Sequence, residues 1–221
     1  MSWRLRPFVT ASTVRILGPA MATRMIEGAR RRPVAASLAC WTALLVLLGL
    51  AYAAPPFERA DEDVLNAIST TSDHLVHDVA FAIEQPLDPP RWFLVGTIAF
   101  LIAVGQRRYR RAFLAAALIA GTGVLVLALK ELFEHPRPLS IPAGLFEWSP
   151  DALAFPSGHS AGAVAYALAF VFVVPRSWQR ATATIGVAFV LAVAIGLLVL
   201  NYHYPSDILG GWLVALGADR E

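Results

Sequence analysis

Cysteine, lysine and charge in general are scarce in this 221-residue chain. The single cysteine, Cys40, excludes an intrachain disulfide and a cysteine-based metal cluster. Charged residues make up only 15% of the chain and hydrophobic residues 57%, a balance that argues against an ordinary soluble domain. Of the 18 lysine and arginine residues only one, Lys130, is a lysine. Its position therefore merits attention, because arginine supplies positive charge everywhere else.

Long apolar runs are abundant. They cover residues 35–54, 92–105, 112–129, 161–174, 181–200 and 208–217. A membrane-spanning helix needs about 20 apolar residues, so the first, third and fifth runs suffice alone and the second and fourth need flanking residues. The runs lack the polar stripe of soluble helices. We therefore predict an all-α polytopic membrane helix bundle with about six transmembrane helices, the last one short; a soluble protein with entirely apolar core helices is the alternative.

The distribution of charge predicts the orientation. Arginines cluster before the first run (24 and 30–32), between the second and third (107–111) and between the fourth and fifth (176–180). Cytoplasmic loops are enriched in arginine and lysine. We therefore expect these clusters and the amino terminus on the cytoplasmic side of a bacterial plasma membrane. We divide the chain into a basic cytoplasmic arm, 1–33, flexible or lying on the membrane surface, and a membrane domain, 34–221.

Two features of the amino-terminal half have alternative interpretations. Arg30–Arg32, the first apolar run and the small residues at 51–53 also fit a cleavable signal peptide, and Met21 offers a later start. The acidic segment 57–91 has apolar residues at helical spacing and is predicted to form amphipathic helices on the outer interface. Within it, His74 and His77 form at best a weak metal site and are more typical of a solvated helix face.

Three polar islands interrupt the apolar sequence, and all fall at run ends on the predicted outer side. They are Lys130 to Pro138, Pro156 to His159, and His203 to Asp207. Phosphoryl transfer through a covalent intermediate needs a nucleophile, cations for the phosphate oxygens and an acid for the leaving group. The islands contain each of these, so they predict a phosphate site at the ends of membrane helices.

Each island supplies a different part of this chemistry. Asp207 follows His203 by four residues, a spacing of one helical turn that lets the carboxylate hold one ring nitrogen while the other attacks phosphorus. Ser157 is a good helix N-cap, Gly158 permits close approach of an anion to backbone N–H groups, and helix amino termini bind phosphate. His159 is then a candidate acid. Lys130 and Arg137 are candidate phosphate-binding cations.

Taken singly, these residues have ordinary structural explanations. Lys130 resembles an interfacial anchor whose amine extends to the headgroups, Ser157 starts a helix in any case, and His203, His159 or His135 can be structural. The order of the three islands and their shared side favour the functional interpretation.

The islands resemble the three signatures of the type 2 phosphatidic acid phosphatase superfamily, which is related to the vanadium haloperoxidases. The resemblance covers roughly residues 35–217. It implies a six-helix membrane fold and hydrolysis without metal or other cofactor, through a phosphohistidine on His203 aided by Asp207. It also implies His159 as the acid, and as phosphate ligands Lys130, Arg137, Ser157 and Gly158.

The third signature departs from the family pattern. It normally begins Ser-Arg, with the arginine six residues before the nucleophile; here these positions are Gly196 and Leu197. Loss of one donor to a developing charge costs roughly 2.7–4 kcal/mol of transition-state stabilisation. We expect a lipid phosphatase whose partners are the membrane and a lipid phosphate, not nucleic acid. Candidate substrates are polyprenyl (pyro)phosphate, phosphatidic acid and phosphatidylglycerol phosphate. A phosphotransferase between lipids and an impaired lipid-phosphate-binding relative remain alternatives, and no oligomeric state is predicted.

Overall fold

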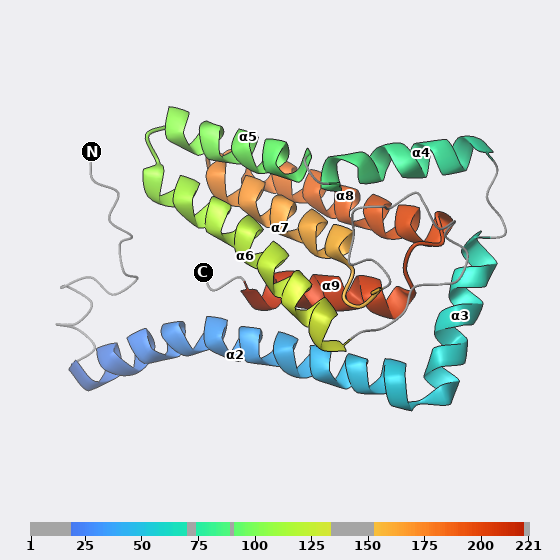
Figure 1. Cartoon of the computed structure of the whole chain (residues 1–221). Helices are drawn as coiled ribbons and strands as arrows, with labels where there is room; N and C mark the ends of the chain where they lie inside the picture. The colour runs from blue at the N-terminus through green and yellow to red at the C-terminus, as the bar shows by residue number, and fades with distance from the viewer. Residues whose placement is uncertain (1–18, 70–73, 89–90, 134–152, 219–221) are drawn as a thin grey trace.

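The computed structural model describes residues 19–69, 74–88, 91–133 and 153–218, with the backbone alone for residues 19–33. Helices form the regular structure of these residues (Figure 1). In chain order they are α2 (Pro19–Ala53), α3 (Pro55–Ser69), α4 (His74–Glu84), the short 3₁₀ helix η1 (Gln85–Leu87), α5 (Arg91–Gly105), α6 (Tyr109–Phe133), α7 (Gly158–Val173), α8 (Gln179–Val199) and α9 (Pro205–Ala218). The predicted all-α helix bundle is confirmed.

Among the described residues, three helices are long and apolar enough to cross a membrane. They are the Val34–Ala53 part of α2, all of α6 and all of α8, and they contain the three runs that met the length requirement on sequence alone. The pair formed by α4 with η1 and α5 passes the same test together but is bent by 61°, which makes four spans if the pair counts as one. With 16 and 14 residues, α7 and α9 fall short of the about 20 residues that a full crossing needs. The six apolar runs therefore form six helices, of which three or four qualify as spans.

The candidate span Val34–Ala53 is part of a longer helix. α2 starts at Pro19 and continues without interruption to Ala53. The boundary predicted between a basic arm (1–33) and the membrane domain (34–221) thus falls inside one helix, and residues 1–18 lie outside the described part.

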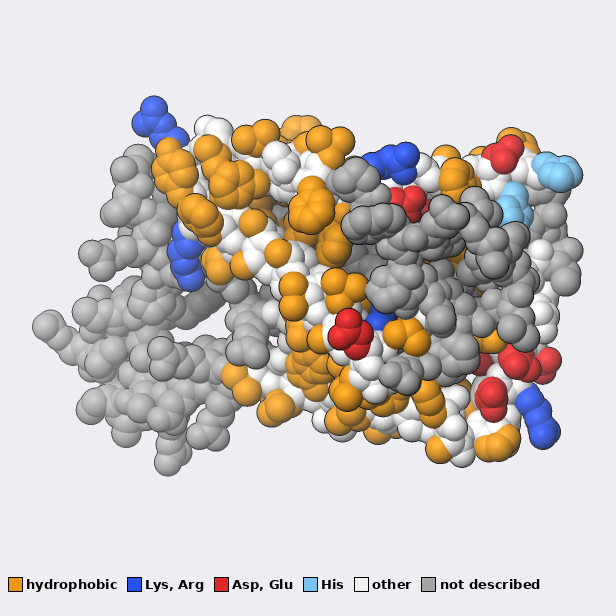
Figure 2. All heavy atoms as spheres, in the orientation of Figure 1, with side chains coloured by type: hydrophobic (Ala, Val, Ile, Leu, Met, Phe, Trp, Pro, Cys, Tyr) orange, Lys and Arg blue, Asp and Glu red, His pale blue; other side chains and the backbone are white. Residues whose placement is uncertain are grey.

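The centre of the bundle is α7, which packs against α5, α6, α8 and α9. Its buried face consists largely of small residues such as Ala161, Gly162, Ala163 and Ala165. Small side chains let neighbouring backbones approach closely, which is how helices associate inside a membrane, where burial of apolar surface gives little driving force. Large apolar side chains point outward instead, among them Phe113, Val124, Ile185 and Val187. In Figure 2 hydrophobic side chains gather over α5, α6 and α2.

The two ends of the bundle differ in charge. At one end, Arg108 and Arg111 from the start of α6 and the turn before it donate to the carbonyls of Val174 and Phe172 at the end of α7, at 3.4 and 3.1 Å. The opposite end carries the amino terminus of α7, the corner between α8 and α9, and the acidic helix α3 (Figures 1 and 2). The polar islands described by the structure gather at this second end, away from the arginine loops.

Candidate active site

A sharp corner between α8 and α9 positions His203. The Tyr202 N–H donates to the Leu197 carbonyl at 3.0 Å and the Asn201 N–H to the Leu198 carbonyl at 3.1 Å, the hydrogen-bond pattern of a Schellman motif. This motif requires a left-handed residue after the helix, and Asn201 has φ 57°; asparagine adopts this conformation more readily than most residues. The α8 helix therefore ends abruptly, and His203 lies in the turn that follows.

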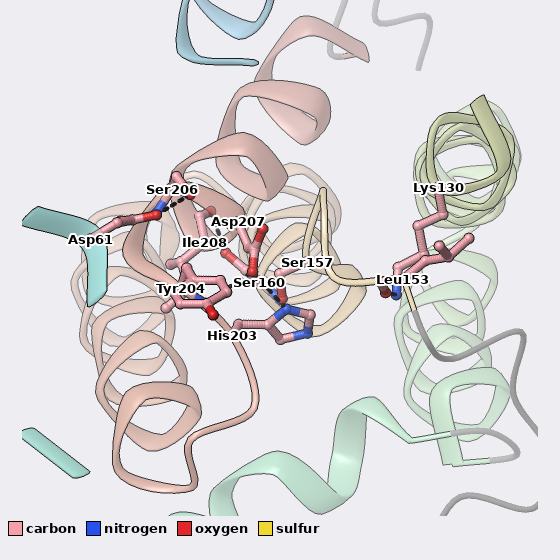
Figure 3. Close-up of polar contacts among 10 residues, drawn as sticks. All are labelled: Asp61, Lys130, Leu153, Ser157, Ser160, His203, Tyr204, Ser206, Asp207 and Ile208. Atoms are coloured by element: carbon pink, nitrogen blue, oxygen red, sulfur yellow. Dashed lines mark hydrogen bonds and ion pairs between the residues drawn. The ribbon is translucent and has the colours of Figure 1, made fainter. Parts of the chain in front are cut away.

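His203 and Asp207 are in contact, as their spacing predicted. Nδ1 of His203 lies 3.4 Å from Oδ2 of Asp207, and both side chains are almost completely buried. His203 precedes the first residue of α9, Pro205, so the pair does not lie on one helical turn; it spans the start of the helix instead. Oδ2 also accepts the Tyr204 N–H at 2.9 Å, which fixes the carboxylate (Figure 3). Nδ1 is directed at Asp207, so Nε2 is the ring nitrogen that points away from this carboxylate.

The second island forms the amino terminus of α7 directly beside this pair. Ser157 is the N-cap, and its side chain accepts the Ser160 N–H at 3.3 Å. The Ser157 N–H donates to the Asp207 carbonyl at 2.9 Å, and the Ser160 hydroxyl donates to the Ile208 carbonyl at 2.8 Å. Two sequence segments about 50 residues apart are thereby joined through their backbones, and the positive end of the α7 dipole lies next to His203.

This junction depends on a glycine in α9. A Cβ at Gly211 would lie 2.5 Å from the Ser157 carbonyl oxygen and 2.9 Å from the Ala161 nitrogen, and backbone atoms have little room to yield. Overpacking of this kind costs about 1–3 kcal/mol. We expect Gly211→Ala to lower the unfolding midpoint in detergent, whereas Gly121→Ala, where nothing lies within 4 Å, should leave it unchanged or raise it, since alanine is the better helix former by about 1 kcal/mol. Equal midpoints for the two variants would contradict the close contact between α7 and α9.

Lys130 approaches the same region from α6. It is only 7% exposed, and its Nζ donates to the Leu153 carbonyl at 2.9 Å, so it contacts the segment that leads into Ser157. One turn earlier on α6, Val126 lies 3.6 Å from where a Cβ of Gly158 would be. Figure 3 shows Lys130 across the view from His203. Its burial disagrees with a simple interfacial anchor, whose amine would reach the headgroups. Arg137 and His135 lie outside the described residues.

His159 contacts Asp88, an acid whose place in the sequence indicated only that it lies on the outer side. Its Nε2 lies 2.9 Å from Oδ1 of Asp88, which follows the short helix η1. Oδ2 of Asp88 lies 3.6 Å from Nη1 of Arg91. A carboxylate at this distance forms a charge-assisted hydrogen bond with a protonated imidazole and orients the ring. Asp88 is 71 residues away from His159 in sequence, and no local spacing points to the pair.

A second unexpected acid is Asp61 of α3. Its Oδ1 accepts the Ser206 N–H at 3.0 Å, and its Oδ2 accepts the Ser206 hydroxyl. The predicted amphipathic segment 57–91 thus contributes two carboxylates, Asp61 and Asp88, to the region of the two histidines. Its histidines do not take part: His74 and His77 are exposed, and the described residues contain no cluster of three or more His, Cys, Asp or Glu side chains suited to a metal ion.

Tyr204, next to His203, is not a candidate base. Burial raises the pKa of its hydroxyl above the usual value, and the nearby carboxylates of Glu62, Asp207 and Asp61 raise it further. The phenol therefore stays protonated throughout the neutral range.

The structure fills the position of the missing signature arginine with apolar packing. Leu197 has no exposed surface and belongs to the main core cluster with Leu87 and Ile208. A Cβ at Gly196 would lie 2.7 Å from Oε1 of Glu84, so the serine of the family pattern fits only if Glu84 moves. Within the described ranges, neither carboxyl oxygen of the buried Glu84 has a hydrogen-bond partner. At this position the chain thus has close packing of Glu84 from α4 against Gly196 of α8.

Comparisons with known proteins agree with this architecture. The sequence family described as PAP2 superfamily matches residues 111–219. Decaprenylphosphoryl-5-phosphoribose phosphatase of Mycobacterium tuberculosis, from strains CDC 1551 / Oshkosh and ATCC 25618 / H37Rv, is 33% identical over 127 residues; the matched part is 55% of this chain and 64%, less than two thirds, of that protein.

A crystal structure of a transmembrane PAP2 type phosphatidylglycerolphosphate phosphatase from Bacillus subtilis has the same fold. It superposes with a TM-score of 0.68 at 22% identity, over 83% of this chain and 92% of that one. The family match contains all three islands, and the bundle of apolar helices identifies an integral membrane protein. The family match over residues 111–219 and the common fold confirm the resemblance of this chain to the PAP2 superfamily.

Proposed function

We propose that the protein is a membrane phosphatase that removes phosphate from a lipid through a phosphohistidine on His203. One observation carries the proposal: the hydrogen bond from the Ser157 N–H to the Asp207 carbonyl, 2.9 Å long, which joins the two islands. It places the His203–Asp207 pair at the amino terminus of the helix that also carries His159. A nucleophile, its orienting carboxylate, an anion-binding helix end and a proton donor are then adjacent.

The proposed reaction has two steps. Nε2 of His203 forms a bond to phosphorus while the bond from phosphorus to the lipid oxygen breaks, and His159 gives a proton to that oxygen. Water then adds to phosphorus, its proton goes to His159, and the nitrogen–phosphorus bond breaks to release phosphate and restore His203. Asp207 accepts a hydrogen bond from Nδ1 throughout, which stabilises the positive charge that develops on the ring.

The remaining signature residues are proposed to bind the phosphate. The Ser157 side chain and the backbone at Gly158 lie at the positive end of α7. Lys130, the single lysine, adds a buried positive charge to the same end of the bundle, and Arg137 belongs to the same proposed set by its place in the first signature. Asp88 orients His159 through the 2.9 Å contact.

The substrate is proposed to be a lipid because the site lies at the end of helices with outward-facing apolar side chains. A lipid keeps its chains in the bilayer while its phosphate enters the polar end. We propose that this end faces the outside of a bacterial plasma membrane, since the arginine loops gather at the other end. The relatives suggest decaprenylphosphoryl-5-phosphoribose and phosphatidylglycerolphosphate as candidates, beside phosphatidic acid and polyprenyl pyrophosphate.

Purified protein in detergent is expected to release inorganic phosphate from at least one of these four lipids. The rate should be unchanged by EDTA, because the proposed nucleophile is an imidazole and needs no metal-bound water. Phosphate release is measured directly, and a water-soluble phosphomonoester of the same headgroup serves as the comparison. Absence of release from all four lipids, or its loss in EDTA, would contradict the proposal.

A lipid phosphotransferase is the second candidate, favoured by the apolar packing at Leu197. Leu197 stands where the family pattern has an arginine. Loss of that cation changes which side chains bind the phosphate during transfer. The same assay separates the two: a transferase would yield a lipid with a new headgroup and little free phosphate when an acceptor alcohol is added.

A further inference from the structure

The helix that follows His203 is capped from within at only one point, where Oδ2 of Asp207 accepts the Tyr204 N–H at 2.9 Å. Tyr204 is its N-cap, because the Tyr204 carbonyl accepts the Ile208 N–H at 3.3 Å. An N-cap residue normally accepts an N–H of the second or third helical residue through a short polar side chain, which tyrosine lacks. Pro205 has no N–H to satisfy. The first donor in need of an external acceptor is therefore Ser206, which is 1% exposed and out of reach of bulk water.

Asp61 of α3 supplies that acceptor from 145 residues away. Its carboxylate accepts both hydrogens that Ser206 can donate, from the backbone N–H at 3.0 Å and from the hydroxyl. A negative charge at a helix amino terminus also interacts favourably with the helix dipole. Figure 3 shows Asp61 reaching Ser206 from α3, on the opposite side of the α9 start from Lys130.

The contact is linked to the proposed nucleophile through one intervening residue. Asp207 follows Ser206 directly, and its Oδ2 holds both the Tyr204 N–H and Nδ1 of His203. A shift of the first turn of α9 would move this carboxylate. The direction of Nε2 of His203 would change with it, because the buried ring is oriented by Asp207.

We propose that Asp61 is a positioning residue for the reaction at His203, an inference that rests on the proposed function. It accepts the Ser206 N–H in place of an N-cap side chain and thereby holds Asp207 and the imidazole in the geometry needed for attack on phosphorus. Helix α3 then contributes a positioning residue to the active site, in addition to connecting α2 to α4.

The test compares two alanine variants of the same helix. Asp61→Ala removes the acceptor, and Asp63→Ala makes the same change of charge at an exposed position. For the lipid phosphate that the wild type hydrolyses, Asp61→Ala should lower kcat by at least about tenfold and change KM by less than about twofold, because misplacement of a reacting group affects the chemical step more than binding. Asp63→Ala should match the wild type in both. Asp61→Asn keeps one carbonyl acceptor and should lose less; it carries the test if Asp61→Ala does not fold.

Hydrogen exchange gives a readout that does not depend on turnover. Backbone amides 206–208 should exchange faster in Asp61→Ala than in Asp63→Ala. An active wild type with unchanged kcat in Asp61→Ala would overturn this inference and leave the proposed function intact. A wild type without activity on any lipid phosphate would overturn the proposed function and this inference with it. A fall in kcat that appears equally in Asp63→Ala would also reject the inference, since it would reflect the charge of α3 alone.

Discussion

His203→Ala is expected to abolish phosphate release. Removing a nucleophile that acts together with its orienting partners lowers kcat by about 10⁶-fold in enzymes of comparable design. The side chain is 1% exposed, and one ring nitrogen faces Asp207, so alanine removes both the proposed nucleophile and its contact with the orienting carboxylate. The measurement is initial phosphate release in detergent, together with trapping of an acid-labile, base-stable phosphorylated protein by rapid quench.

The matched control is His77→Ala. His77 is exposed on α4, and the same substitution there should leave phosphate release unchanged. If His203→Ala retained more than a few per cent of the wild-type rate, or if trapped phosphate were found on another residue, the phosphohistidine on His203 would be wrong.

His159→Ala is expected to lower kcat by about 10²–10⁴-fold, the range for loss of a general acid. The loss should depend on the leaving group. With an ordinary lipid alcohol the departing alkoxide needs a proton, whereas an aryl phosphate of low leaving-group pKa departs without one. The rate of the variant on such an aryl ester should therefore approach that of the wild type, while its rate on the lipid stays low.

Comparing the lipid with the aryl phosphate also distinguishes a residue that protonates the leaving group from one that binds the phosphate. Ser157→Ala alters the cap of α7 and should weaken turnover of both substrates by similar factors. Equal losses on both substrates in His159→Ala would show that this residue does not act as the acid in the first step.

The local parts of the site were predictable because local spacing determines them. Ser157 caps α7 and the His203–Asp207 contact forms, since both depend on residues within four positions of one another. Asn201 was a missed local signal: an asparagine after a long apolar helix is typical of the left-handed residue that ends it. The three longest apolar runs became the three longest spans for a similar reason, since composition alone decides whether a helix of that length can lie in hydrocarbon.

The contacts that complete the site join residues remote in sequence. Asp88 meets His159, and Asp61 meets Ser206, across separations of 71 and 145 residues. In the sequence both acids were part of one acidic segment, where they indicated only the outer side. Nothing in their spacing distinguished them from exposed neighbours such as Asp63. Which acids reach the site depends on the face that α3 turns toward the bundle and on where the chain leaves η1.

The sequence by itself determined the helical membrane class, the positions of the polar islands and the resemblance to a known family, all of which follow from composition and short-range pattern. Only the tertiary structure decided that α7 lies at the centre, that Gly211 brings α9 against Ser157, and that Glu84 packs where the family pattern has a serine. The physical reason is that close packing and burial are properties of pairs of surfaces. The effect of a glycine or a carboxylate on packing depends on which atoms of another helix it contacts, and these contacts are known only once the helices are arranged in the fold.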